Sequence, residues 1–201
     1  RSIEPLHLLT LEVVRAALKD AGYLDRPFPR ERTSVILGAG GGADLGGRYG
    51  FRSMLPYFLH HTANGAGERE KIVQELSEML PEWTEDSFAG ILTNVAAGRV
   101  ANRFDLGGRN FTVDAACAAS LAAVDLAVRE LEEGSSDMVV VGGADTMQSP
   151  FAYLCFSKTH ALSPRGHCHT FDDSSDGIAI SEGIAMIILK RLADAERDGD
   201  R

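Results

Sequence analysis

The sequence predicts a layered α/β fold with a sheet of parallel character. Short apolar segments at 33–37, 138–141 and 185–189 have the composition of buried strands. Longer segments between them place apolar residues three or four positions apart, as expected for helices with one buried face. Strands that alternate with helices are typical of layered α/β sheets. The length of 201 residues suits one ordinary domain or a piece of a larger one.

The N-terminal third is predicted to contain one helix and one strand. The helix, at 5–20, ends where Gly22 supplies a stop, and a β-branched strand follows at 33–37. The segment 38–50 contains seven glycines and is predicted to hold no regular element. Apolar residues at helical spacing define the face of the helix expected to be buried: Leu8, Leu11, Val14 and Leu18.

The middle third is predicted to be largely helical. An exposed amphipathic helix at 68–80 would end at Pro81, and a helix rich in small residues follows at 86–103. A short strand at 111–114 leads into a helix at 117–133, which Gly134 would cap in the left-handed conformation. That helix is predicted to bury a single stripe of residues: Leu121, Val124, Val128 and Leu131.

The last third is predicted to form two buried strands. The first, at 138–141, would end at the paired glycines 142 and 143 and be covered on both faces. A helix at 151–159 and a mostly irregular segment at 161–176 separate it from the second, at 185–189. The final residues, 194–201, have the composition of a polar turn that leads onward, so we interpret the chain as a fragment.

Composition disfavours several classes of function. Lys and Arg number 20 against 29 Asp and Glu, and the net charge of −9 disfavours binding to nucleic acid. No apolar run approaches the roughly 20 residues that span a bilayer, and the N-terminus lacks the layout of a signal peptide. Three cysteines do not suit a disulfide scaffold. We therefore expect a cytoplasmic protein with neither a membrane nor a nucleic acid as partner.

The most informative residue is Cys117, which follows a predicted strand and opens a predicted helix. Ala115 and Ala116 are small enough to permit a sharp turn between the two. The first turn of a helix has free N–H groups and a partial positive charge, which favour the nucleophilic thiolate. The backbone N–H of Cys117 would then serve as one oxyanion donor during attack on a thioester. The alternative is that Cys117 is a small buried apolar residue.

Three other sequence patterns give weaker indications of function. The segment 38–43 fits G-x-G-x-x-A, but Gly46 and Gly47 would fall within the helix that should follow, and no acidic residue lies about 20 positions on. A nucleotide site is therefore disfavoured. No metal site is expected, because the spacing of Cys155, His160, His167, Cys168 and His169 does not suit a zinc finger. The acidic residues expected to hold turns rather than act in catalysis are Asp172, Asp176 and Glu182.

Taken together, several motifs in order resemble the β-ketoacyl synthase (ketosynthase) family, which has the thiolase fold. Segment 114–120 is similar to the family's nucleophile motif, Asp-Thr-Ala-Cys-Ser-Ser-Ser. The chain departs from the family pattern at His169, Ser175 and Ser181. Further matches lie at 97–108, at 141–144, at Phe156 with 161–166, at 171–177 and at 181–183.

The resemblance implies a thiolase-like fold, a mixed sheet with helices on both faces. Residues 1–201 would form a partial ketosynthase domain, an incomplete N-terminal half without the family's first strand and C-terminal half. Cys117 is the single catalytic residue that carries over, because none of the six histidines falls in the family's histidine motifs. Phe156 would line the acyl pocket and bind substrate, although a core position is the alternative for any phenylalanine.

The implied function is condensation in polyketide or fatty-acid synthesis. The phosphopantetheine arm of an acyl carrier protein would deliver acyl and malonyl thioesters to Cys117, with no metal and no directly bound cofactor. The family also implies a homodimer, in which the strand at 109–113 pairs with its mate. The Ala-Ala-Cys-Ala-Ala-Ser variant resembles iterative synthases of the enediyne and polyunsaturated-fatty-acid type. As an isolated fragment, the chain would accept an acyl group without condensing it.

Two alternatives remain open at this point. One is a thiolase-type enzyme on the same fold that uses coenzyme A thioesters. The other is a non-catalytic ketosynthase-like partner subunit, which the presence of Cys117 disfavours.

Overall fold

The computed structural model describes residues 2–40, 44–62, 65–79 and 81–200, and these contain a four-stranded mixed sheet in the order β2-β1-β3-β4. Strands β1 (Thr33–Gly38), β2 (Asn110–Val113) and β3 (Met138–Asp145) run parallel. Strand β4 (Gly183–Leu189) pairs antiparallel with β3, with Val141 opposite Ile187. The predicted α/β class with parallel character is confirmed.

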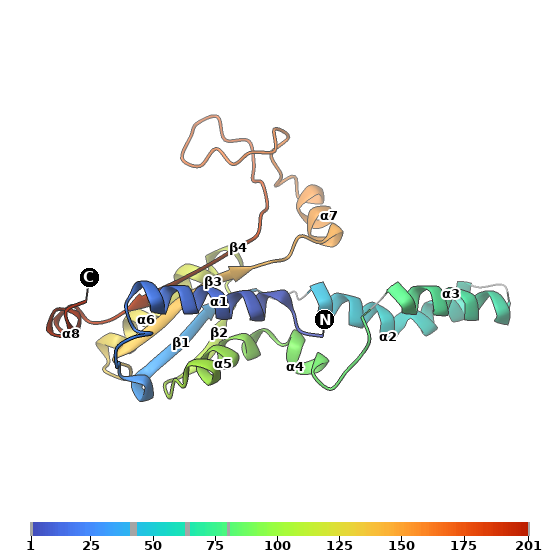
Figure 1. Ribbon diagram of the computed structural model, residues 1–201. Helices are drawn as coiled ribbons and strands as arrows, with labels where there is room; N and C mark the ends of the chain where they lie inside the picture. Colours follow the sequence, from blue (N-terminus) through green and yellow to red (C-terminus); the bar gives the residue numbers. More distant parts are fainter. Residues whose placement is uncertain (1, 41–43, 63–64, 80, 201) are drawn as a thin grey trace.

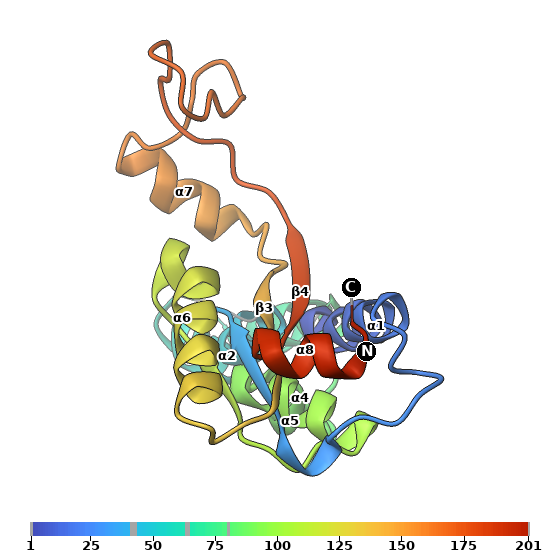
Figure 2. The same cartoon turned by 90° about the vertical axis from the view of Figure 1, so that its left-hand side faces the viewer.

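Helices cover both faces of this sheet (Figures 1 and 2). Helices α1 (Pro5–Asp20) and α5 (Thr93–Phe104) pack on one face, where Val35, Leu37 and Val140 point into the larger core. Helix α6 (Ala119–Glu132) packs on the other face, against Ile36, Val139 and Val141. Adjacent residues of β1 and β3 thus contribute to two separate cores, which explains why these strands are apolar throughout.

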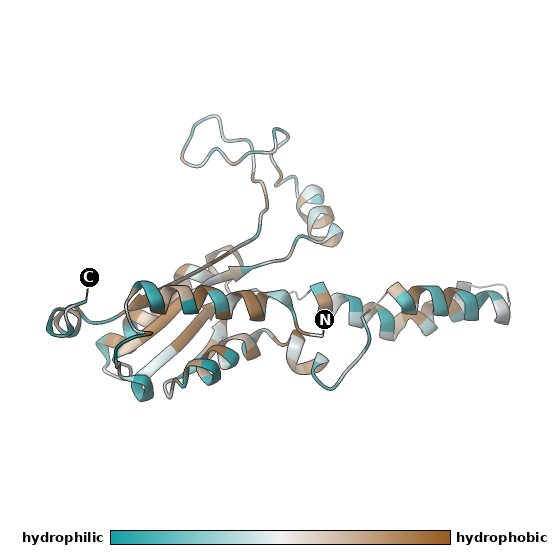
Figure 3. Ribbon diagram, in the orientation of Figure 1, coloured by the Kyte–Doolittle hydropathy of each residue, from teal (hydrophilic) through white to brown (hydrophobic). Residues whose placement is uncertain are grey.

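The remaining elements extend from this centre (Figure 1). Helices α2 (Asp44–Thr62) and α3 (Ala66–Met79) pack together and project from one end of the sheet, and the short α4 (Ser87–Ile91) precedes α5. Helix α7 (Pro150–Lys158) and the irregular segment after it rise away from the sheet before the chain returns as β4. Figure 3 shows brown, apolar residues concentrated in the central strands and on the helix faces against them.

The predicted absence of structure across 38–50 is wrong for its second half, because α2 begins at Asp44. Tertiary contacts outweigh the low helix propensity of its glycines. The backbone N–H of Leu45 donates a 3.0 Å hydrogen bond to the Glu4 carboxylate, which caps the helix from a distant segment. The buried Tyr49 hydroxyl bonds the carbonyl of Glu82 at 3.0 Å and the hydroxyl of Ser87 at 2.9 Å.

The predicted helix at 86–103 is interrupted, because Leu92 adopts an extended conformation between α4 and α5. The predicted polar turn at the C-terminus is also wrong: Leu192–Asp198 forms helix α8, which ends at Gly199 with φ +68°. Ion pairs from Lys190 to Asp198 (2.6 Å) and to Asp200 (2.7 Å) hold the end of α8 against β4. Local composition does not reveal which charged residues pair in the folded chain, so the sequence did not predict this helix.

Two predicted helix faces need correction. On α1, Val14 and Leu18 are buried as predicted, but Leu8 is exposed, and the rest of the buried face consists of Leu6, His7 and Thr10. On α6, Leu121 is 74% exposed and Val128 40%, whereas Ala123, Ala127 and Leu131 are buried. On α6, small side chains face the sheet because the backbone of the helix approaches the strands closely.

Strand β3 does not end at its paired glycines, since it continues to Asp145. A Cβ on Gly142 would collide with the carbonyl oxygen of Ala185 in β4, so this glycine permits strand pairing rather than ending it. Strand β4 is less buried than predicted: of its residues only Met186 is fully covered. No described helix combines the length and the apolar character needed to cross a membrane.

Candidate functional site

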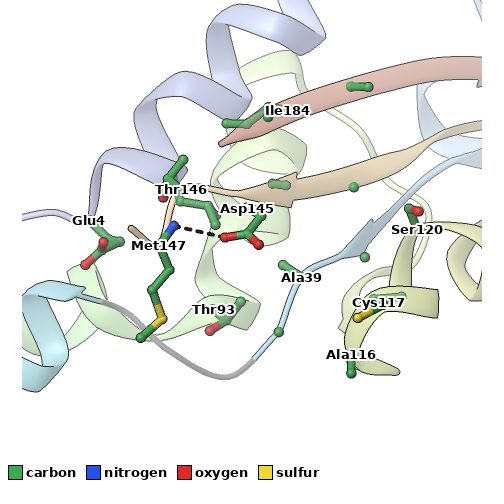
Figure 4. A pocket seen from close by; sticks show the side chains of 18 of the residues that line it. Glu4, Ala39, Thr93, Ala116, Cys117, Ser120, Asp145, Thr146, Met147 and Ile184 are labelled. Atoms are coloured by element: carbon green, nitrogen blue, oxygen red, sulfur yellow. Dashed lines mark hydrogen bonds between the residues drawn. The ribbon is translucent and has the colours of Figure 1, made fainter. Parts of the chain in front are cut away.

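A cleft of about 750 Å³ lies at the carboxyl ends of β1 and β3. Its walls come from the end of β1, the last residues of β3, the start of β4, the turn before α6 with the first residues of that helix, and residues of α1, α4, α5 and α7. Figure 4 shows Cys117 on one side of this cleft and Asp145 and Met147 on the other. Ligand sites of open α/β sheets lie at the carboxyl ends of their parallel strands, which makes this the candidate active site.

Cys117 lies in a single 3₁₀ turn, Ala116–Ala118, which connects β2 to the first residue of α6. Its side chain is exposed and lines the cleft (Figure 4). The predicted position at the opening of a helix is therefore confirmed. The alternative assignment of Cys117 to the buried core is wrong.

Two glycines bring this turn against the sheet. A Cβ on Gly38, the last residue of β1, would lie 2.5 Å from the carbonyl oxygen of Ala119. A Cβ on Gly143 of β3 would lie 2.7 Å from the Cβ of Ser120. Real Cβ atoms do not approach other atoms so closely, so any larger residue would push the start of α6 outward. Glycines on two adjacent strands thus set the height of Cys117 above the strand ends.

The turn also has an unusual backbone. Ala116 has φ +49°, and its N–H donates a 2.9 Å hydrogen bond to Oδ1 of Asp114. The N–H of Ala118 then donates to the carbonyl of Ala115 at 3.0 Å, which closes the 3₁₀ turn. The nucleophile candidate therefore sits on a sharp reversal between a strand and a helix.

Phe156 comes to the same cleft from α7. Its side chain is half-buried and belongs to neither apolar core. The structure therefore brings the two residues chosen from the sequence, Cys117 and Phe156, to one cavity.

Glu4 and His7 also line the cleft, and neither was selected from the sequence. His7 is 1% exposed, and its Nδ1 accepts a 3.2 Å hydrogen bond from Nε of Arg99. Burial and, to a lesser extent, the Arg99 cation together lower the pKa of His7 to about 4, against the opposing effect of a hydrogen bond with the Leu92 backbone. Burial likewise raises the pKa of Glu4. His7 lies at helical spacing from Val14 and Leu18, so a polar residue on the buried face of α1 is the sequence signal that could have found it, whereas Glu4 precedes the helix and has no such signal.

The segment 38–43 does not form a nucleotide site at the start of α2. Residues 41–43 lie outside the described part of the chain, but the N-terminus of α2 itself is described. There the Glu4 carboxylate accepts the N–H of Leu45. A carboxylate at that position repels the phosphate that a dinucleotide would place there.

Asp172 and Asp176 lie outside the cleft and have structural partners. Oδ1 of Asp172 accepts a 2.7 Å hydrogen bond from the N–H of Ser174. Asp176 accepts hydrogen bonds of 2.7 Å from Ser163 and from Arg165. These hydrogen bonds lower the pKa of both carboxyl groups. The predicted turn-holding role is confirmed for Asp172, whereas Asp176 instead accepts from two side chains of a separate segment. Within the described residues, no three His, Cys, Asp or Glu side chains gather in a metal-binding arrangement.

Comparisons with known proteins agree with this geometry. The profile "Beta-ketoacyl synthase, N-terminal domain" matches residues 1–195. One component of the polyunsaturated fatty acid synthase of Thraustochytrium sp. is 40% identical over 197 residues, which is 96% of this chain and 7% of that protein. One component of the phenolphthiocerol/phthiocerol polyketide synthase of Mycobacterium tuberculosis is 35% identical over 200 residues, or 100% of this chain and 8% of that one.

Solved structures show the same relationship. The ketosynthase from module 6 of the bacillaene synthase of Bacillus subtilis 168 superposes with a TM-score of 0.73 at 27% identity, covering 99% of this chain and 28% of that one. The oxazolomycin ketosynthase domain OzmH KS7 of Streptomyces albus JA3453 gives 0.70 at 27% identity, covering 100% and 30%. The chain thus spans less than a tenth of these two curated relatives and under a third of the two solved domains.

The sheet, its helical layers and the cleft at the strand ends define a thiolase-like α/β protein. Within that class, the chain belongs to the β-ketoacyl synthase family. The resemblance inferred from the motifs is confirmed.

Proposed function

We propose that this chain carries the nucleophile of a β-ketoacyl-[acyl-carrier-protein] synthase that acts in polyketide or fatty-acid biosynthesis, and that Cys117 is this nucleophile. One observation carries the proposal: an exposed cysteine lies on the turn that opens α6 and faces a cleft at the strand ends. Family membership gives this arrangement its chemical meaning.

The first half-reaction is acyl transfer. The Cys117 thiolate attacks the carbonyl carbon of an acyl thioester, and a new C–S bond forms while the bond from that carbon to the carrier sulfur breaks. The carrier leaves as a thiolate, which takes up a proton from water. The turn before α6 presents Cys117 to the cleft, and the N–H of Cys117 is one donor to the oxyanion. Phe156 contributes an apolar wall for the acyl chain.

The second half-reaction is condensation. A malonyl thioester loses carbon dioxide, and the resulting carbanion attacks the acyl carbonyl on Cys117. A C–C bond forms, the Cys117 thiolate leaves, and the acyl chain is two carbons longer. The family's catalytic histidines are expected outside these residues. We therefore propose that the isolated chain accepts an acyl group but does not condense it.

The partners follow from the same chemistry. An acyl carrier protein delivers both substrates on its phosphopantetheine arm, and neither a metal nor a directly bound cofactor is required. Strand β2 lies at the edge of the described sheet, where it could pair with the same strand of a second copy. A homodimer in the cytoplasm is the assembly we propose. The relationship to a polyunsaturated fatty acid synthase supports an iterative enzyme of that general type.

Intact-mass spectrometry tests the proposal directly. The chain and its Cys117→Ala variant are each incubated with an acyl group carried on a phosphopantetheinylated carrier protein. The parent chain is expected to gain the mass of one acyl group, and the variant none. Equal labelling of both would defeat the assignment of Cys117. Repeating the assay with acyl-coenzyme A as competitor separates the carrier-dependent synthase from a coenzyme A-dependent thiolase.

A further inference from the structure

The residue before Cys117 has a conformation that its side chain does not favour. Ala116 lies in the left-handed region, which L-residues with a Cβ rarely adopt. Of the three other described non-glycine residues with positive φ, Phe171 lies in the irregular segment after α7, and Asp105 and His160 follow the ends of α5 and α7, where this conformation closes a helix. Ala116 instead precedes a helix, so helix termination does not account for it.

Asp114 supplies the contact that stabilises this conformation. Its Oδ1 accepts the 2.9 Å hydrogen bond from the N–H of Ala116, two residues on, so the carboxylate replaces a backbone carbonyl in closing the turn. The carboxylate also lies against the segment that follows β1, since a Cβ on Gly40 would be 3.3 Å from Oδ1. Asp114 is thus held between the end of one strand and the turn that presents the cysteine.

We propose that Asp114 is a positioning residue for acyl transfer. As a hydrogen-bond acceptor it holds Ala116 in the left-handed conformation, and this directs the sulfur and the N–H of Cys117 into the cleft. The inference rests on the proposed function, because it assigns Asp114 a part in acylation of Cys117. The chemical step is unchanged: Sγ bonds to the acyl carbon, the bond from that carbon to the departing sulfur breaks, and the departing thiolate takes up a proton from water.

The acceptor atom, rather than the negative charge, is the useful property of this side chain. The N–H of Ala116 needs an acceptor oxygen at this position and does not require that oxygen to be charged. An asparagine keeps an oxygen in the same place without the charge, whereas an alanine removes both. Glycine at position 116 would adopt positive φ without help. Asp114→Asn, Asp114→Ala and Ala116→Gly together therefore distinguish a role for the acceptor oxygen from a role for the negative charge.

The test measures acylation of Cys117 by octanoyl-N-acetylcysteamine, with the adduct located by peptide mass mapping. Asp114→Ala is expected to slow acylation about tenfold, the effect of losing one well-placed hydrogen bond on the geometry of attack. Asp114→Asn is expected to keep most of the parent rate across pH 6 to 9. The double variant D114A/A116G is expected to recover most of the loss. Alkylation of Cys117 by iodoacetamide, which needs no oxyanion donor, should change far less in all of them.

Asp172→Ala is the matched control, because Asp172 makes the same kind of turn with the N–H of Ser174 but does not line the cleft. It should leave acylation unchanged. If Asp114→Asn loses as much as Asp114→Ala, or if glycine at 116 recovers nothing, the proposed positioning role is wrong. A parent chain that is not acylated at Cys117 at all would overturn the proposed function itself, whereas equal rates in parent and Asp114→Ala would overturn only this inference. Circular dichroism at the assay temperature confirms that each variant compared is folded.

Discussion

Gly143 in β3 lies so close to Ser120 in α6 that a Cβ on the glycine would be 2.7 Å from that of the serine. Helix α6 can therefore rest directly on the sheet only where β3 lacks a side chain. Cys117 lies in the turn that enters this first part of α6. Its position in the cleft thus depends on two residues that approach each other from distant parts of the chain.

Gly143→Ala is predicted to displace the start of α6 and misplace Cys117. We expect a loss of about 1–3 kcal/mol in the free energy of unfolding, typical of an overpacked contact. Acylation at Cys117 should slow by more than the loss of folded protein explains, because small displacements of a reacting group are costly. Urea unfolding and adduct formation measured on the same preparation check both effects.

Gly50→Ala serves as the control, since a Cβ at Gly50 meets no atom within 4 Å and the residue lies inside α2. It should raise stability slightly, by up to about 1 kcal/mol, because alanine is the better helix former. If Gly143→Ala is as harmless as Gly50→Ala, the close packing of α6 does not control the cysteine.

The buried His7 predicts a dependence of stability on pH. Its pKa is about 4 in the folded chain, against about 6.5 for an unfolded histidine. Between these values the unfolded chain binds more protons, so the free energy of unfolding falls as pH decreases from about 6.5 towards 4. His7 contributes at most about 1.4 kcal/mol per pH unit to the slope of the free energy of unfolding in this range. Above about pH 6.5 the slope disappears and the stabilising contribution of the neutral His7 is complete.

Urea unfolding at a series of pH values compares the parent with His7→Gln, which does not titrate in this range. The variant is expected to be less stable at pH 7 and to show a flatter profile between pH 6.5 and 4. His167→Gln, at an exposed position, should reproduce the parent profile. Parallel profiles for His7→Gln and the parent would mean that His7 takes up its proton in the folded chain as readily as in the unfolded one.

Lys190 is predicted to be the main anchor of the C-terminal helix. Its side chain is 6% exposed and pairs with Asp198 and Asp200, and it donates a 3.0 Å hydrogen bond to the Tyr23 hydroxyl. Burial alone would lower the pKa of Lys190, but these hydrogen bonds raise it well above its usual value. Lys190→Met would remove the cation that Asp198 and Asp200 share, while Asp198 keeps its pair with Arg197 and Asp200 its pair with Arg26. We therefore expect a loss of about 2 kcal/mol in the free energy of unfolding.

An exposed ion pair gives the comparison for Lys190. Lys71 and Glu75 are 3.9 Å apart on α3, and both side chains are mostly exposed to solvent. Lys71→Met should change stability by no more than about 0.5 kcal/mol. Similar losses in the two variants would show that the Lys190 cluster does not fasten α8.

The two faces of α6 provide a further prediction. Leu131→Ala, at a buried position, is expected to cost about 2–4 kcal/mol in the free energy of unfolding. Leu121→Ala, at an exposed position, should cost less than about 0.5 kcal/mol. Equal costs in thermal or urea unfolding of the chain would contradict the observed orientation of the helix.

This orientation shows what sequence patterns can and cannot predict here. The bounds of α1 and the positions of β1 and β2 followed from local periodicity and from glycine stops such as Gly22. The buried face of α6 did not, because Leu121 and Val128 look like core residues until the close approach at Gly38 and Gly143 is known. That approach joins segments far apart in the sequence, and local composition carries no record of it.

The residues of the candidate site also fall into two groups, those that the sequence identified and those that it did not. Cys117 and Phe156 were identified by their motifs, and the fold brings both to one cleft. Glu4 and His7 were missed, because their positions in the cleft follow from how α1 packs beside α5 and the start of α2. Motifs identify residues whose role is tied to their neighbours in the sequence. Which other residues line the cavity is decided by tertiary packing.

The most direct test of the central claim uses the three cysteines of the chain as internal references. Cys117, Cys155 and Cys168 are all exposed, but only Cys117 combines exposure with the turn that opens α6 beside the cleft. After brief exposure of the parent chain to an acyl-carrier-protein thioester, peptide mass mapping locates the acyl group. We predict that it is found on Cys117, with Cys155 and Cys168 unmodified. An acyl group spread evenly over the three cysteines would contradict the account.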